Sequence, residues 1–430
     1  MRVEDVVAVP VPAAEYATRL RGARSPGAVE AEVEATVREI VERVSREGDV
    51  AVIDYTAKLD TAGTQPWPLR VDPLELEQAL EELPAPLHDA LELAAANVRA
   101  VALAQVGTDR ELELGDGQRV ALREVAVRRA AVYVPGGRAP YPSTALMGAV
   151  AAQVAGVDEV VVCAPPRADG DSHREILAVC ALCGVGEVYR MGGAQAVAAL
   201  ALGTQAIPAV DVVVGPGNAY VQEAKRQLVH LIGIDSFAGP SELMVILDDA
   251  ADARLVALDL LAQAEHGPAS PLLAVSPSSP ALERLAAQLS SLGAADAAAE
   301  SCHLLAVDDF HQALALADAF APEHLQLVGG EAEALAPQVR CAGAVFVGEA
   351  SGTAFGDYVA GSNHVLPTGG AARFASVLSP HTFRRRLAQV TVPESPRRLA
   401  SAGALIARAE GFVAHAESMR ARIGDNGSDV

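Results

Sequence analysis

Apolar residues recur at helical spacing near both ends of the chain. In residues 28–48 they fall three or four positions apart and the run closes at Gly48, so the pattern predicts an amphipathic helix. Residues 74–106 predict a second helical region that prolines interrupt, and residues 397–422 predict a final helical segment.

The pattern changes at residue 131, where short β-branched runs begin to alternate with helix-like stretches. Runs starting at residues 131, 159, 187 and 211 lie 28, 28 and 24 residues apart, which is the length of one strand–helix unit. A second set of strands is expected at residues 242–249, 272–277, 303–309, 325–330 and 344–349. We therefore predict an α/β fold with two successive Rossmann-like (incomplete) parallel-sheet domains and small helical N- and C-terminal segments.

Composition narrows the class of protein. The 430 residues are too many for one small core, and 51% of them are hydrophobic but only 4% aromatic, which favours helices packed on parallel sheets. The net charge of −22 opposes binding to nucleic acid or to anionic membranes. No signal peptide and no membrane-spanning run is evident, so we expect a soluble, cytoplasmic protein.

The five cysteines are too few and too uneven for a disulfide framework. Cys180 and Cys183 form a CxxC pair, which suggests a redox or zinc site. No second such pair exists, however, and the two lie in an apolar run, so we favour two buried small hydrophobic residues.

Glycine-rich turns follow several of the expected strands, at Gly136–Gly137, Gly192–Gly193 and Gly215–Pro216–Gly217. Such turns let a backbone approach a phosphate at the start of the next helix. None matches GxGxxG, so they indicate either an irregular nucleotide site or ordinary strand-to-helix turns.

Two pairs of polar residues could carry chemistry. Gln263 and His266, three positions apart at a helix end, could bind a divalent cation or simply face solvent. Glu323 and His324, on a turn that leads into a strand, could serve as a general base and a water activator, or as ordinary loop residues.

Residues 351–370 contain Asp357, Tyr358, Asn363 and His364 among five glycines. A polar, glycine-rich stretch of this length inside a compact domain is usually functional. Glu410 and His415 fall in the last helical segment and, taken alone, would be surface residues.

Together these segments resemble the histidinol dehydrogenase family over nearly the full chain. The motifs that carry the resemblance are YVPGGRAPYPST (133–144), GGAQAVAALA (192–201), VGPGNAYVQEAKRQL (214–228), AGPSEL (238–243), LLAQAEHGP (260–268), APEHLQL (321–327), GDYVAGSNHVLPTGG (356–370) and EGFVAHAESM (410–419).

The resemblance implies a role for each matched residue. It implies a zinc ion, one per subunit, with the ligands Gln263, His266, Asp357 and His415. It implies that Glu323 and His324 form the acid–base pair and that NAD contacts Tyr133, Gln195 and Asn218. The implied substrate contacts are Ser241, Gln263, His266, His324, Asp357, His364, Glu410 and His415.

The resemblance also implies an activity and a domain plan. The activity is the oxidation of L-histidinol through L-histidinal to L-histidine with NAD⁺, in a homodimer whose C-terminal segment reaches the partner's site. The domain plan has an N-terminal segment (1–25), an α/β domain with the metal and acid–base residues (26–110 with 241–380), an NAD-binding α/β domain (111–240) and a C-terminal helical segment (381–430).

Two other readings compete with this one. The first is a related zinc and NAD enzyme that oxidises another polar alcohol, such as a hydroxysulfonate. The second is a non-catalytic protein that binds a metal or a nucleotide. His364, Glu410 and the Glu323–His324 pair favour histidinol over another polar alcohol. The acid–base residues beside four candidate ligands disfavour a non-catalytic protein.

Overall fold

The computed structural model of the chain describes residues 15–18, 27–64, 68–136, 139–267, 269–292 and 302–423. The chain divides into two compact units. The larger contains Met1–Gln105 and Val127–Phe383, and the smaller contains Val106–Ala126 and Arg384–Val430. The four-part domain plan stays a prediction, and most of its N-terminal segment lies outside the described residues.

The first sheet of the larger unit is parallel and has the strand order β5-β4-β3-β6-β7. Its strands are β3 (Arg129–Tyr133), β4 (Glu159–Ala164), β5 (Glu187–Arg190), β6 (Val212–Val214) and β7 (Gly233–Ile234). The intervening helices are α6 (Pro142–Ala155), α7 (Arg174–Leu182), α8 (Gly193–Leu202) and α9 (Ala219–Leu228). The four strands expected from the sequence are confirmed; β7, only two residues long, carries no pattern that could predict it.

This sheet is preceded in the chain by the N-terminal helices α2 (Gly27–Glu47), α3 (Asp49–Leu59), α4 (Pro73–Glu81) and α5 (Ala85–Gln105). Buried residues of α2 and α3, such as Val37, Ile40 and Val52, share one hydrophobic core with β3, β4 and α8. Helix α4 packs against α7, and α5 packs against α6. The first sheet is therefore covered in part by helices that the domain plan groups with the second.

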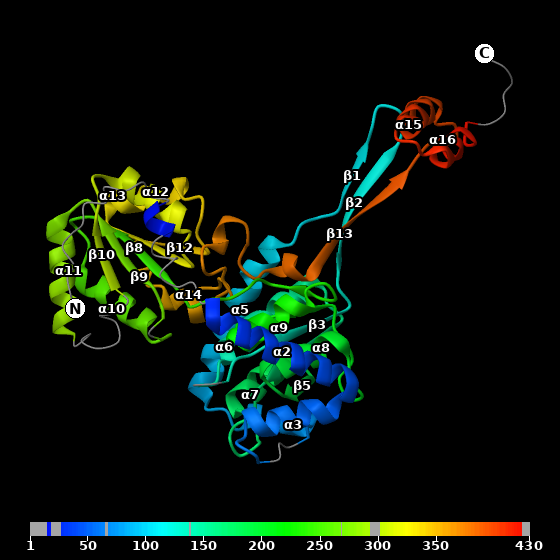
Figure 1. Cartoon of the computed structure of the whole chain (residues 1–430). Coiled ribbons are helices and arrows are strands. Elements are labelled where there is room, and N and C mark those ends of the chain that lie inside the picture. Colours follow the sequence, from blue (N-terminus) through cyan, green and yellow to red (C-terminus); the bar gives the residue numbers. More distant parts are fainter. Residues whose placement is uncertain are drawn as a thin grey trace. The chain divides into compact units, whose positions relative to one another are not determined.

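The second sheet repeats the same topology. It is parallel, has the order β10-β9-β8-β11-β12, and is formed by β8 (Leu243–Leu247), β9 (Leu272–Ser276), β10 (Cys302–Ala306), β11 (His324–Val328) and β12 (Ala344–Val347), as Figure 1 shows. Its helices are α10 (Ala253–Ala264), α11 (Ser279–Ser291), α12 (Phe310–Phe320), α13 (Gly330–Glu333) and α14 (Ala354–Tyr358), with 3₁₀ turns at Ala336–Gln338, Ala371–Arg373 and Pro380–Phe383. All five expected strands are confirmed.

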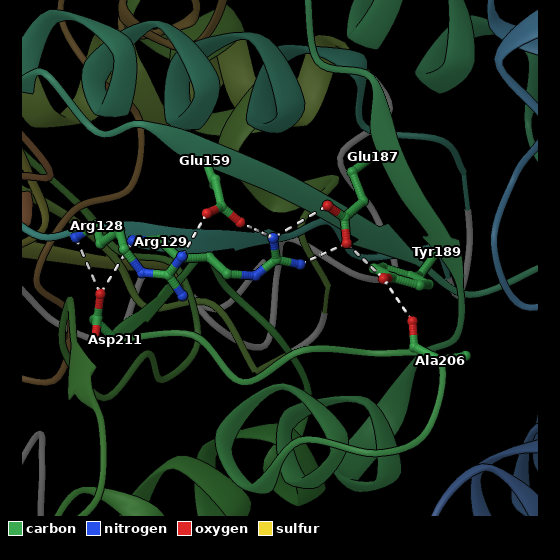
Figure 2. Close-up of polar contacts among 7 residues, drawn as sticks. All are labelled: Arg128, Arg129, Glu159, Glu187, Tyr189, Ala206 and Asp211. Atoms are coloured by element: carbon green, nitrogen blue, oxygen red, sulfur yellow. Dashed lines mark hydrogen bonds and ion pairs between the residues drawn. The ribbon is translucent and has the colours of Figure 1, made fainter.

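A buried arginine joins three strands of the first sheet at their amino ends (Figure 2). The Arg129 guanidinium, 2% exposed, donates to Glu159 at 2.5 Å and to Glu187 at 2.5 and 3.1 Å. Tyr189 donates to Glu187 and to the carbonyl of Ala206. Burial acts against the charge of Glu187, but Arg129 and Tyr189 together lower the pKa of that carboxyl. The network holds the amino ends of β3, β4 and β5 in alignment with one another.

The smaller unit consists of an antiparallel sheet and two helices. Its strands, in the order β1-β2-β13, are β1 (Arg110–Glu113), β2 (Arg119–Ala126) and β13 (Arg384–Thr391). The helices α15 (Arg397–Ala409) and α16 (Val413–Arg420) pack on each other through small residues such as Ala404 and Ala416. The expected C-terminal helices are confirmed, whereas the sheet was not foreseen.

No helix in the described ranges combines the length and the apolar character that crossing a membrane requires.

Candidate active site

A cavity of about 760 Å³ opens within the larger unit. Turns at the carboxyl ends of the first sheet supply one part of its lining, including Pro135, Gly193 and Asn218. Residues at the amino ends of the second sheet supply another part, because Ser241 precedes β8 and Glu323 precedes β11. In parallel strand–helix units the helix ends return to the amino edge of the sheet, so the end of α10 also reaches this place.

Glu323 lies at the centre of a short hydrogen-bonded chain. Its carboxylate accepts hydrogen bonds from the Ser241 hydroxyl at 2.5 Å and from the Glu242 backbone N–H at 2.8 Å. The buried Gln263 amide donates to the Ser241 hydroxyl at 2.6 Å. Three of the residues that the sequence singled out are thus brought into direct contact.

His324, 2% exposed, is held in one tautomer. Its Nδ1 lies 2.9 Å from the carbonyl oxygen of Glu242, and a carbonyl can only accept, so Nδ1 carries a proton. Its Nε2 lies 3.8 Å from the Asp357 carboxylate, while Nδ1 lies 3.5 Å from that of Glu323. The nitrogen available for proton transfer in the cavity is therefore Nε2.

The surroundings of His324 also change its basicity. Burial alone would lower its pKa, but the carboxylates of Glu323 and Asp357 outweigh burial and raise the pKa of His324 to about 10. From the sequence alone, the pKa of this imidazole is expected near neutrality. The two carboxylates make His324 a much stronger proton acceptor than an isolated imidazole.

Asp357 is placed by the short helix α14 and lines the cavity. Burial acts to raise its pKa, but the imidazoles of His324, His364 and His266 together lower it. The carboxylate is thus held in its charged form among three histidines, which is the state that metal ligation or cation binding requires.

His364 is a neutral imidazole with both nitrogens engaged. Its Nδ1 lies 3.0 Å from the carbonyl oxygen of Asp357, so Nδ1 donates, and Nε2 then accepts from the Thr144 hydroxyl at 2.9 Å. Burial lowers the pKa of His364. Because Thr144 belongs to α6 of the first sheet, this pair connects the two parts of the cavity lining.

The three expected NAD contacts all line the same cavity. Tyr133, at the end of β3, accepts a hydrogen bond from Gly193 N–H at 3.1 Å. Gln195 in α8 is fully buried; its Nε2 lies 3.3 Å from the Asp60 carboxylate, and its Oε1 has no hydrogen-bond partner among the described residues. An unsatisfied amide oxygen facing a cavity is expected where a ligand completes the hydrogen bonding.

Hydrogen bonds and a steric constraint within the protein hold Asn218 and the turn that precedes it in place. The Asn218 side chain caps α9 by accepting from the N–H groups of Tyr220 and Val221 at 3.1 Å. Gly215 has a φ of +114°, and a Cβ there would lie 2.1 Å from the Tyr133 carbonyl oxygen, so only glycine fits.

A buried ion pair holds the same glycine. The fully buried Lys225 ammonium donates to the Gly215 carbonyl and to Asp235, each at 2.6 Å, and Asp235 accepts from Gly215 N–H at 2.7 Å. Both polar groups of the Gly215 peptide are thereby clamped. We call Lys225, Asp235 and Gly215 the glycine clamp.

The expected metal ligands are divided between the two units. His266 and Asp357 line the cavity, and Gln263 contacts Ser241 there, so three of the four converge. Their amide, imidazole and carboxylate groups form the mixed nitrogen and oxygen donor set that Zn²⁺ accepts. The donors therefore fit a zinc ion.

A tight cluster of possible ligands occurs elsewhere. Among the described residues, only His88, Asp89 and Glu92 form a group of three or more His, Cys, Asp or Glu side chains with ligand atoms within 4.8 Å of one another. They lie on one turn of α5, and the two acids are exposed. Such acidic surface groups are common without a metal.

Glu410 and His415 lie in the smaller unit. Glu410 ends α15, and His415, in α16, packs its ring 5.2 Å from that of Phe412. Both side chains are exposed. Their predicted role in the site stays a prediction.

The CxxC cysteines take no part in the cavity. Cys180 is buried in α7 and Cys183 is partly buried, and both are free thiols. Burial raises the pKa of Cys183 to about 11, as expected for an inert thiol.

Three cavity residues were missed in the sequence. Thr144 contacts His364, Thr368 accepts from Gly239 N–H at 2.5 Å, and Asp60 contacts Gln195. Thr144 and Thr368 lie within matched motifs, so the motifs could have identified them. Asp60, at the end of α3, lies outside all the matched motifs, so no motif indicated it.

Known histidinol dehydrogenases are similar to this chain over nearly its whole length. The family model for histidinol dehydrogenase matches residues 23–423. The chain is 44% identical over 398 residues to a histidinol dehydrogenase of Synechococcus sp., covering 90% of this chain and 92% of that protein. It is 43% identical over 408 residues to a histidinol dehydrogenase of Bradyrhizobium diazoefficiens, covering 92% of this chain and 94% of that protein. The crystal structure of histidinol dehydrogenase from Elizabethkingia anophelis superposes with a TM-score of 0.87 at 31% identity, covering 91% of this chain and 92% of that one.

Proposed function

The chain belongs to the histidinol dehydrogenase family, and we propose that it oxidises L-histidinol through L-histidinal to L-histidine, with one zinc ion per subunit and two molecules of NAD⁺. The observation that carries the proposal is one cavity that holds an acid–base pair, Glu323 and His324, within reach of three candidate metal ligands. The same cavity extends to the glycine-rich turns of a Rossmann-like sheet, where dinucleotides bind.

Both cofactors have residues that fit them. Gln263, His266 and Asp357 would hold the zinc ion together with His415, and the ion would supply a fixed positive centre for the nitrogens of the substrate. Tyr133, Gln195 and Asn218 would contact NAD⁺, which accepts the hydride that leaves the alcohol carbon.

His324 is proposed as the base for the first oxidation. Its Nε2 takes the proton of the substrate hydroxyl, which allows the carbinol carbon to release a hydride and become an aldehyde. The carboxylates of Glu323 and Asp357, 3.5 and 3.8 Å from the ring nitrogens, stabilise the imidazolium that forms. The hydrogen bond from Nδ1 to Glu242 keeps Nε2 directed toward the reaction.

Glu323 is proposed to act in the second oxidation. An aldehyde must first add water, because only the hydrate carries the hydrogen and hydroxyl that a second hydride removal requires. The Glu323 carboxylate takes a proton from the attacking water, and Ser241 and the Glu242 N–H hold its oxygen in place. As the water adds, His324 returns its proton to the aldehyde oxygen, which becomes a hydroxyl of the hydrate. His324 then accepts a hydroxyl proton of the hydrate as the second hydride leaves.

A variant can separate the two steps. With Glu323→Gln, we expect the oxidation of histidinal to lose at least about 100-fold in kcat, while the oxidation of histidinol to the aldehyde is reduced less. Glu283→Gln, on the exposed face of α11, is the matched control and should behave as wild type. Equal losses in both half-reactions would contradict the assignment of Glu323 to hydration.

The family also suggests that Glu410 and His415 act on the site of a partner subunit. A mixture of His266→Ala and His415→Ala chains should then regain part of the activity that each variant lacks, because hybrid dimers contain one intact site. Activity of the mixture no greater than that of the two separate variants would contradict a shared site.

The substrate itself is tested by competition between alcohols. NADH formation should be rapid with L-histidinol and absent with dihydroxypropane sulfonate, because the imidazole of histidinol is the group that the metal would bind. The reverse preference would assign the chain to a different polar alcohol.

A further inference from the structure

The cavity has two chemically different parts. Around His324 and Asp357 the titratable groups act on one another, since the imidazoles that lower the pKa of Asp357 are those of His324, His364 and His266. Asp60 belongs to the other part, where it contacts Gln195 and acts electrostatically on Tyr133. Both parts line the same continuous space.

Within the part of the chain that the structure describes, the Asp60 carboxylate has no cationic partner. It ends α3 and lines the cavity, and among the described residues no lysine or arginine pairs with it. Its single described side-chain hydrogen bond is the 3.3 Å contact with Gln195 Nε2. Burial without a partner cation raises the pKa of Asp60 to about 6.

Such a group makes the empty fold less stable, because its ionised form loses hydration and gains little in return. The neighbouring Gln195 Oε1 is fully buried and also lacks a partner among the described residues. In the described ranges, Gln195 Oε1 thus has no hydrogen-bond donor and the Asp60 carboxylate has one. Side by side on a cavity wall, these two acceptors fit a ligand with hydrogen-bond donors and without negative charge at that place.

The place where the hydride is transferred indicates which part of the dinucleotide lies beside Asp60 and Gln195. This step rests on the proposed function. The nicotinamide ring must reach the carbinol carbon beside His324, so the far part of the cavity is left for the adenosine half of the dinucleotide. The donors of that half are the two ribose hydroxyls and the adenine amino group.

We propose that Asp60 is the residue that selects NAD⁺ over NADP⁺, by accepting a hydrogen bond from the adenosine ribose and repelling a 2′-phosphate. In many Rossmann domains an acidic residue after the second strand has this role. Here the carboxylate comes instead from the end of a helix that precedes the first sheet in the chain and packs against α8. The selectivity therefore depends on the N-terminal helices.

The experiment is a titration of wild type and two variants, Asp60→Asn and Asp60→Ser, with NAD⁺ and with NADP⁺ by isothermal calorimetry. Wild type should bind NAD⁺ more tightly than NADP⁺. Each variant should reduce this ratio by about tenfold or more, because a hydrogen bond to a charged group is lost and a repulsion is removed. Asp54→Asn on the same helix, where Asp54 pairs with Arg43 and does not line the cavity, is the matched control.

Thermal unfolding of the nucleotide-free proteins distinguishes a lost contact from a damaged fold. Asp60→Asn should melt at or above the wild-type temperature at pH 7.5, because an unfavourable buried charge has been removed. An unchanged NAD⁺ to NADP⁺ ratio in a folded Asp60 variant would overturn the assignment of Asp60 alone. Failure of wild type to bind either dinucleotide would overturn the proposed function as well.

Discussion

Replacing Lys225 by methionine tests how the glycine clamp supports the cofactor side of the cavity. Methionine keeps most of the length and the apolar stem of lysine but has no ammonium group. The change leaves the Asp235 carboxylate, whose side chain is 6% exposed, without its cation, and leaves the Gly215 carbonyl without its 2.6 Å donor.

The magnitude follows from the burial of both partners. Removing one partner of a buried ion pair costs about 3–5 kcal/mol, because the remaining charge is neither paired nor hydrated. The double variant Lys225→Met/Asp235→Leu leaves no charge behind, but it leaves Gly215 N–H unpaired, which costs about 1–3 kcal/mol. The double variant should therefore be more stable than the single one.

Urea unfolding followed by circular dichroism gives both free energies. Arg226→Met provides the control, since Arg226 is the next residue of the same helix and its guanidinium is half exposed where it contacts Glu223 and Glu34; its loss should cost about 1 kcal/mol. The double variant should also bind NAD⁺ more weakly than wild type, because the turn that leads to Asn218 is no longer clamped. A single variant as stable as Arg226→Met would refute the reasoning.

Three further predictions concern proton binding and strand alignment. Because the base must be unprotonated and the pKa of His324 is raised to about 10, kcat/KM for histidinol should rise from pH 7 toward pH 10; a profile flat across this range would contradict that base. Arg129→Met should lower the free energy of unfolding by about 1–3 kcal/mol, measured in urea, because two partly exposed carboxylates, Glu159 and Glu187, lose their hydrogen bonds to the guanidinium. The pKa of Asp60 rises on folding from 3.8 to about 6, so the folded state holds the proton more tightly, and its stability should fall as pH increases through this interval. Asp60→Asn should abolish that decrease, which is worth about 1 kcal/mol for a partly solvated carboxyl, and an identical slope in the variant would exclude it.

Apart from β7, the strands of both parallel sheets could be predicted from the sequence, because they are short apolar runs and most of them are buried. Strands β4 (Glu159–Ala164) and β8 (Leu243–Leu247) contain such runs of valine, leucine and isoleucine. The antiparallel sheet of the smaller unit could not be found in this way. Its strand β13 begins with three arginines and is mostly exposed, so no apolar pattern marks it.

The residues of the site also fall into those that the sequence could predict and those that it could not. Ser241, Gln263 and Glu323 lie in motifs, and the strand topology explains why they meet at one sheet edge. Lys225 shows the limit of such reasoning: in a helix rich in charged residues it looks like a solvent-exposed lysine, yet the fold buries it completely against Gly215. A contact of this kind depends on the three-dimensional position of a turn, which local sequence does not encode.

The most direct test of the central claim is the stoichiometry of the reaction after metal removal. Protein stripped of metal under anaerobic conditions is assayed with L-histidinol, with and without added Zn²⁺, while NADH and L-histidine are both quantified. The account predicts no turnover without metal and, once zinc is restored, two NADH for each histidine formed. One NADH for each substrate consumed, with the aldehyde accumulating, or full activity without any divalent metal, would contradict it.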